Sequence, residues 1–254
     1  MNKRVSSLVL VGALALGSVL PLTANAEAVT ETSGKTTSDV EFLPPENVIN
    51  PVDPTDPGKT VTDPDGAKDP GGATVDPTGP LSFLYVSPSI DFGHQKAVSS
   101  NTQNISNADT PGQITVASQK FNGTDPNTNL VTEVSDTRGT SVGWNVQVSS
   151  TPLTLEGATD VLKGATINLG ANDTAKNIVN NSGDATGIDG QDAALSTENG
   201  NAATIYTAAK DAGAGQTAFQ LSPDNITMTG IEANAKAGTY KGTLTWTLND
   251  TPVE

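Results

Sequence analysis

The longest alternating run of the chain is GTYKGTLTWTLN, residues 238–249. Successive side chains of a strand point to opposite faces, so every second residue shares a face. One face of this run carries apolar side chains and the other carries polar ones; the apolar set is Tyr240, Leu244, Trp246 and Leu248. The run therefore predicts a strand that turns one face toward a hydrophobic core.

The same two-residue period recurs in two earlier runs, residues 81–86 and 142–149. The faces that alternation predicts are Leu81, Phe83 and Tyr85 in the first run, and Trp144, Val146 and Val148 in the second. Each run therefore predicts another strand with one apolar face.

Weaker strands are expected over six short ranges, separated by residue types that favour turns. They are 113–118, 153–155, 165–169, 203–207, 217–221 and 226–231. Residues 171–202 and 208–216 are expected to be loops, with a helical turn as an alternative over 202–210. Eight to ten short strands indicate an all-β fold, which is a single antiparallel β-sandwich or barrel-like domain over residues 81–254.

Residues 44–80 differ in kind, because they hold nine of the sixteen prolines and five Asp-Pro pairs. Such a composition buries too little apolar surface to offset the entropy of ordering, and proline favours an extended chain. We therefore interpret residues 27–80 as an extended N-terminal segment followed by a disordered stalk rich in Pro and Asp. A partner-binding motif in this region is the alternative, and its one apolar patch is Val40–Leu43.

The first 26 residues have the plan of a secretory signal peptide. Lys3 and Arg4 precede the apolar run Val5–Leu20, and Ala24-Asn25-Ala26 is a small-residue cleavage site. The run is shorter than the roughly 20 residues that a membrane-spanning helix needs. We expect a secreted chain that begins at Glu27 and has no transmembrane span after cleavage; an uncleaved membrane anchor is the alternative.

The chain is acidic, with a formal net charge of −15. Residues 1–26 hold two basic and no acidic side chains, so their removal changes this charge to −17. Binding of nucleic acid requires a basic footprint, and anionic lipid attracts basic segments, so the charge argues against both partners. The chain has no cysteine and no sorting motif after Asn249, so we expect neither a disulfide nor a covalent anchor.

Several segments together resemble the WxL cell-wall-binding family of low-GC Gram-positive bacteria. Residues 240–252, which contain Trp246-Thr247-Leu248, resemble the closing segment of WxL domains. Residues 143–148 resemble the family's first Trp motif, with Val146 where leucine is usual, and residues 81–93 resemble the start of the domain. With the stalk and the signal peptide, the resemblance covers nearly the whole mature chain.

The resemblance implies a non-enzymatic surface protein that attaches non-covalently to the peptidoglycan of the cell wall. It also implies membership of a cell-surface complex with companion proteins, namely sortase-anchored and membrane-anchored WxL-interacting proteins. The binding residues that it implies are Trp144, Val146, Tyr240, Gly242, Trp246 and Leu248. The alternative is a structural or adhesive surface protein that binds host matrix proteins or neighbour-cell molecules, and a secreted wall-active enzyme comes third.

The two tryptophans have two interpretations. Each shares a strand face with other apolar residues, as core residues do, and an apolar core position tolerates valine in place of leucine at 146. We therefore expect Trp144 and Trp246 to be core residues. The alternative is direct contact, with an indole stacked on a sugar ring or seated in a pocket of a partner.

No pattern of catalytic residues stands out in the sequence. His94 is the only histidine and follows Gly93 in a predicted turn, so we expect it on the surface. Zinc would lack cysteine and a second histidine as ligands. The acidic run DATGIDGQD, residues 184–192, does not match the calcium loop D-x-D-x-D-G, so we expect a solvated loop, with calcium as the alternative. The sequence predicts no metal site, no cofactor and no enzymatic activity.

Overall fold

The computed structural model describes residues 36–61, 75–121, 125–172, 178–233 and 235–251. The expected signal peptide and its cleavage site lie outside these residues. The chain divides into two compact units, Met1–Glu41 and Phe42–Glu254. In the first unit, the described residues 36–41 are exposed and belong to no helix or strand.

The second unit is built from three four-stranded antiparallel sheets. The first has the order β13(Ala193–Ser196)-β10(Thr166–Leu169)-β16(Ile226–Ile231)-β5(Gln103–Ser106). The second has the order β11(Ile178–Asn180)-β15(Gly215–Leu221)-β7(Leu130–Asp136)-β3(Leu81–Val86). The third has the order β12(Ile188–Gly190)-β14(Ala202–Ala208)-β8(Trp144–Ser150)-β18(Leu244–Asn249). All pairings in these sheets are antiparallel.

Three two-stranded sheets complete the described fold. They pair β1(Val52–Asp53) with β2(Asp56–Thr60), β4(Ile90–Asp91) with β6(Thr115–Val116), and β9(Thr154–Leu155) with β17(Tyr240–Lys241). One turn of 3-10 helix, η1(Pro223–Asn225), precedes β16, and its first N–H groups are capped by Ser222, whose hydroxyl accepts from the N–H of Asp224.

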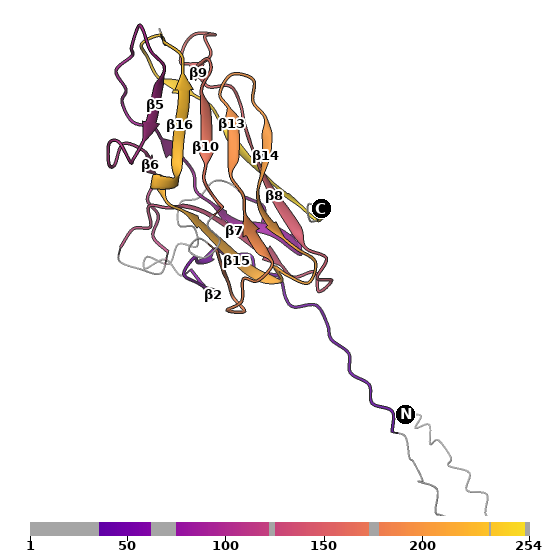
Figure 1. The fold of residues 1–254 in the computed structure, drawn as a ribbon. Helices are drawn as coiled ribbons and strands as arrows, with labels where there is room; N and C mark the ends of the chain where they lie inside the picture. The colour runs from indigo at the N-terminus through magenta and orange to yellow at the C-terminus, as the bar shows by residue number, and fades with distance from the viewer. Residues whose placement is uncertain (1–35, 62–74, 122–124, 173–177, 234, 252–254) are drawn as a thin grey trace, which may run out of the picture. The chain divides into compact units, whose positions relative to one another are not determined.

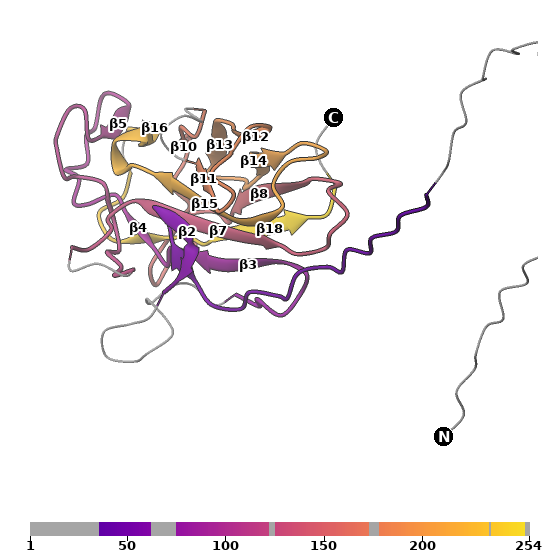
Figure 2. The same cartoon turned by 90° about the horizontal axis from the view of Figure 1, so that it is seen from below.

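The sheets pack as a β-sandwich around one main core. In Figures 1 and 2, β5, β16, β10, β13, β14 and β8 lie side by side in one layer, and β15, β7 and β3 lie in the other. The core between them combines side chains from all three sheets, with Phe219 stacked on Tyr206 at 3.9 Å between ring centroids. The expected all-β fold with a sandwich architecture is therefore confirmed.

Every strand that the sequence predicts is present, but some strands were missed. Residues 202–208 form β14, so the alternative of a helical turn there is wrong. The expected loop over 171–202 contains β11, β12 and β13. The central strand β7 was not predicted at all, and all seven of its residues are buried. Its sequence, LVTEVSD, contains acidic and hydroxyl residues, so it lacks the continuous apolar run that is typical of a strand covered on both faces.

The alternating run at the C-terminus forms two strands rather than one. β17 pairs with β9, and β18 pairs with β8. The chain changes partner at Gly242 and Thr243, where the N–H of Thr243 donates to the hydroxyl of Thr151 at 2.9 Å and Thr243 accepts from the N–H of Thr151 at 2.9 Å. A Cβ at Gly242 would lie 2.9 Å from a methyl carbon of Leu153, so a larger residue here would require the Leu153 side chain to shift.

A β-bulge in β3 overturns the expected face of Tyr85. Phe83 pairs with Val134, but Tyr85 pairs with Glu133, because the register shifts between Phe83 and Tyr85. An extra residue in one strand moves every later side chain to the opposite face. Phe83 therefore packs against the main core, whereas Tyr85 joins a second cluster, with Val61, Phe121 and Val131.

Residues 51–61 depart from the expectation of an unstructured stalk. They form the β1–β2 hairpin, in which Val52, Pro54, Pro57 and Val61 are buried. The hydroxyl and N–H of Thr55 donate to the carboxylate of Asp53 at 2.7 and 2.9 Å, which forms the turn. The Asp-Pro pairs that predict a spacer here build a turn instead, because proline and aspartate also favour turns.

Candidate functional site

The candidate site is a groove between two strands that each end a sheet. Among the described strands, β3 is hydrogen-bonded only to β7, and β18 only to β8, so each is an edge strand of its sheet. A cavity of about 350 Å³ lies between them. Its lining residues come from β3, from β18 and from the segment before β3: Phe83 and Val86, Leu244, Thr245 and Trp246, and Val75 and Asp76.

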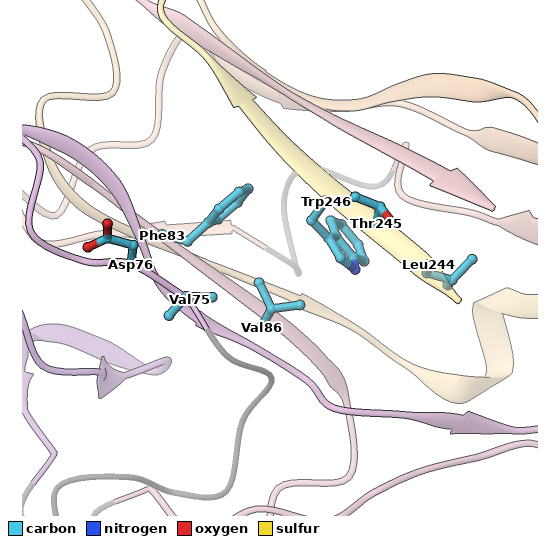
Figure 3. Close-up of a pocket in the computed structure, with 7 residues that line it drawn as sticks. All are labelled: Val75, Asp76, Phe83, Val86, Leu244, Thr245 and Trp246. Carbon is cyan, nitrogen blue, oxygen red and sulfur yellow. The ribbon is translucent and has the colours of Figure 1, made fainter. Parts of the chain in front are cut away.

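Trp246 projects from β18 into this groove. Figure 3 shows its indole facing the space that Phe83, Val75 and Val86 border on the opposite side. Trp246 pairs with Val148 of β8 and so shares the core-facing side of the sheet. It is nevertheless only partly buried, because β18 has a neighbouring strand on one side alone.

Trp144 occupies a different environment. Its side chain is fully buried, its indole N–H donates to the carbonyl of Gly213 at 3.0 Å, and its ring packs edge-on against Phe219 at 5.9 Å. The core interpretation therefore fits Trp144. Trp246 also packs against the main core, but it is only partly buried, it borders the groove, and its N–H donates to no group among the described residues.

The other four motif residues are spread over the fold. Val146 is fully buried in the main core and pairs with Leu248, which is partly buried. Tyr240 is partly buried in β17, and its hydroxyl accepts from the N–H of Lys236 at 3.1 Å. Gly242 is exposed and lies at the break between β17 and β18. Of the six residues that the resemblance implies, Trp246 alone lines the groove.

The groove has an apolar floor and one acidic residue in its lining. The N–H and hydroxyl of Thr78 donate to the Asp76 carboxylate at 3.1 and 2.6 Å, and these bonds hold the pKa of Asp76 below its usual value. Asp76 is therefore ionised at neutral pH and accepts hydrogen bonds only. The arrangement suits a ligand with an apolar face and hydroxyl, amide or ammonium donors at its edge.

Sequence reasoning missed the half of the groove that β3 supplies. The alternation of residues 81–86 predicts the apolar face on which Phe83 lies, but nothing local marks that face as open. Its partner across the groove, Trp246, is 163 positions later in the chain. No local signal marks either strand as an edge, because the place of a strand in its sheet depends on partners far away in the chain.

The remaining candidates from the sequence lie apart from the groove lining. His94 is exposed. Residues 184–192 are not wholly a solvated loop as expected, because they include β12, in which Ile188 is buried. Asp184 accepts from the N–H of Thr186 at 2.8 Å, Asp192 accepts from the amide of Asn172 at 2.9 Å, and both aspartates are exposed. Within the described residues, no three acidic or histidine side chains gather as a metal site would require.

No helix in the described part of the chain has the length and apolar character needed to cross a bilayer.

Comparison with known proteins identifies the family. The model of the family described as WxL domain, surface cell wall-binding, matches residues 29–252. No curated protein and no solved structure matches the chain. The match spans nearly all of the sequence and includes both β3 and β18. The chain therefore belongs to the family of surface proteins with a cell-wall-binding WxL domain.

Proposed function

We propose that this protein is exported and attaches non-covalently to the peptidoglycan of a Gram-positive cell wall, with the groove between β3 and β18 as its contact site. Membership of a surface family that binds the cell wall supports the location and the partner. The contact site is supported by one observation, which is the partly exposed Trp246 with an indole N–H that no described residue satisfies.

The chemistry of the groove favours a glycan strand. An indole presents a flat apolar face, against which the C–H face of a sugar ring can pack, and its N–H remains available to a hydroxyl or carbonyl oxygen. Asp76 supplies an acceptor for hydroxyl or amide donors of the same ligand. A cavity of about 350 Å³ also falls within the range of small-ligand sites.

We further propose that the protein joins a complex with companion surface proteins, which are sortase-anchored and membrane-anchored. Phe42 and Leu43 support a protein contact, because they are large apolar side chains that are 86% and 78% exposed. Adjacent exposed apolar residues are a common mark of a site that binds another protein. The proposed role is binding without catalysis, in keeping with the family's description.

Isolated cell walls stripped of protein provide the test of this proposal. Purified protein from Glu27 onward should sediment with the walls and be released by chaotrope or high salt, without digestion of the wall. Protein that stays in the supernatant would contradict wall binding. Binding to host matrix proteins in the absence of wall binding would support the adhesive alternative in its place.

A further inference from the structure

Residues 51–61 form a strap over the outer face of the β11-β15-β7-β3 sheet. The strap is closed on itself by the β1–β2 pairing and by the N–H of Val61, which donates to the carbonyl of Pro51 at 2.8 Å. Its two strands form a separate sheet and share no ladder with the sandwich. Side chains and single hydrogen bonds therefore hold the strap in place.

The described contacts that fasten the strap to the sheet include two hydrogen bonds and one apolar cluster. The N–H of Val52 donates to Oε2 of Glu133 at 2.9 Å. The amide of Gln220 donates to the carbonyl of Pro54 at 3.2 Å. The third contact is apolar, with Val61 packed in the cluster that contains Tyr85, Phe121 and Val131.

The contact between Val52 and Glu133 is unusual, because the carboxyl group of Glu133 is fully buried beneath the strap. Among the described residues, no group hydrogen-bonds to its Oε1 and no cation pairs with it. Burial is the main cause that raises the pKa of Glu133; the hydrogen bond from the Val52 N–H lowers it and the nearby charge of Asp53 raises it, and the net pKa is about 8. At neutral pH the docked strap therefore covers a protonated carboxyl group.

The other charged groups on the packed elements leave Glu133 without a counter-ion. On the strap, Lys59 pairs with Asp56 at 2.6 Å, and both side chains are well exposed. β3 contributes Tyr85 opposite Glu133, and β15 contributes no titratable residue. Ionisation of Glu133 with the strap in place would leave a buried, unpaired carboxylate, which is costly.

We propose that the strap opens as a unit from the sheet and that its opening is coupled to loss of one proton from Glu133. Opening hydrates the carboxyl group, and a solvated carboxylate needs no partner. It also uncovers the apolar cluster around Val131 and Tyr85, so the strap gates a surface of the sandwich. The strap shares no hydrogen-bond ladder with the described strands of the sandwich, and such a local unit can open below the free energy of global unfolding.

The coupling fixes how opening depends on pH. In the open state the Glu133 carboxyl has the usual glutamate pKa of 4.5, and in the docked state its pKa is about 8. Between these values only the docked state holds the proton. Each pH unit in this window therefore multiplies the ratio of open to docked molecules about tenfold, and the ratio levels off above the window.

A single engineered thiol can measure the opening, because the chain has no cysteine. Val61→Cys puts the thiol beneath the strap, where the native side chain is 3% exposed. Its labelling rate is divided at each pH by the rate of a free cysteine peptide, which removes the titration of the thiol itself. The same measurement is made in the Glu133→Gln background, and Val134→Cys, on the inner face of β7, reports global unfolding.

The corrected rate at position 61 should rise about tenfold per pH unit from pH 6 to pH 7.5. It should be nearly independent of pH with Glu133→Gln, and at every pH it should exceed the rate at position 134 at least tenfold. Equal rates at 61 and 134 would show that the strap opens only when the sandwich unfolds, and would overturn the proposal. An equally steep pH dependence with Glu133→Gln would overturn the coupling to Glu133.

Discussion

Trp246 of β18 and Val148 of β8 face one another across the strand pair, yet Val148 is fully buried and Trp246 is not. The difference follows from position in the sheet, because β8 lies between β14 and β18, whereas β18 is an edge. In the second Trp motif, the side chain of Trp246 therefore points toward the core and is also accessible to solvent. In the first motif, the side chain of Trp144 points toward the core and is not accessible to solvent.

Trp144→Ala should lower the free energy of unfolding by about 3–5 kcal/mol. The change removes a fully buried ring, its edge-on packing on Phe219 and its hydrogen bond to Gly213. Chemical denaturation monitored by circular dichroism measures the loss. A loss below about 1 kcal/mol would show that Trp144 is not a core residue.

Gly213→Ala should destabilise the domain more than Gly112→Ala does. Both glycines have positive φ, +74° and +77°, which costs alanine about 1 kcal/mol. At 213 the added Cβ would also lie 2.7 Å from Nε1 of Trp144, whereas at 112 no atom lies within 4 Å. The extra loss at 213 should be about 1–3 kcal/mol, and equal melting temperatures for the two variants would contradict the packing described for Trp144.

Arg138→Met should lower the free energy of unfolding by about 3–5 kcal/mol, because it leaves the buried carboxylate of Asp136 without its cation. The pair is 2.8 Å apart, with side-chain exposures of 13% and 3%. Arg138 also donates to the carbonyls of Gly143 and Asp250, and so ties the β7–β8 loop to the end of β18. Lys241→Met, which breaks an exposed pair with Glu156, should change the melting temperature little. Adding Asp136→Asn to Arg138→Met should restore part of the loss.

The stability of the wild type should fall as pH rises from about 4.5 to 8 relative to that of Glu133→Gln. The folded pKa of Glu133 is raised to about 8 from 4.5, so the folded state holds a proton that the unfolded state releases. The contribution of this group is therefore most favourable below pH 4.5 and declines by about 1.4 kcal/mol per pH unit until pH 8. Denaturation of both proteins at pH 5, 6 and 7 measures the difference, and parallel curves would contradict the burial of Glu133.

The fold class could be predicted from the sequence because apolar residues alternate with small or polar ones in several of its strands. The runs at 81–86, 142–149 and 244–249 all form strands. β7 could not be found in this way, because both of its faces are covered and its buried Glu133 and Asp136 look like surface residues. Their burial depends on distant partners, Val52 of the strap for Glu133 and Arg138 for Asp136.

The groove could be predicted only in part. The resemblance to the WxL family points to Trp246, but it points equally to Trp144 and Val146, which are core residues. Periodicity gives the face of a side chain and not the place of its strand within the sheet. Phe83 and Val86 meet Trp246 only because β3 and β18 are edges of different sheets, and that is a property of the topology.

The measurement that tests the role of the groove most directly is wall binding and stability of Trp246→Ala in the same preparation, with Thr247→Ala as the matched control. Thr247 is the next residue of β18, and its side chain is exposed on the opposite face. Because Trp246 is only partly buried, its loss should cost about 1–2 kcal/mol of stability and leave the domain folded. Wall affinity should fall about 30-fold or more, as for a residue worth ~2 kcal/mol at the centre of an interface. Thr247→Ala should bind and melt like the wild type. A folded Trp246→Ala protein with unchanged wall affinity would contradict the assignment of the groove as the wall-binding site.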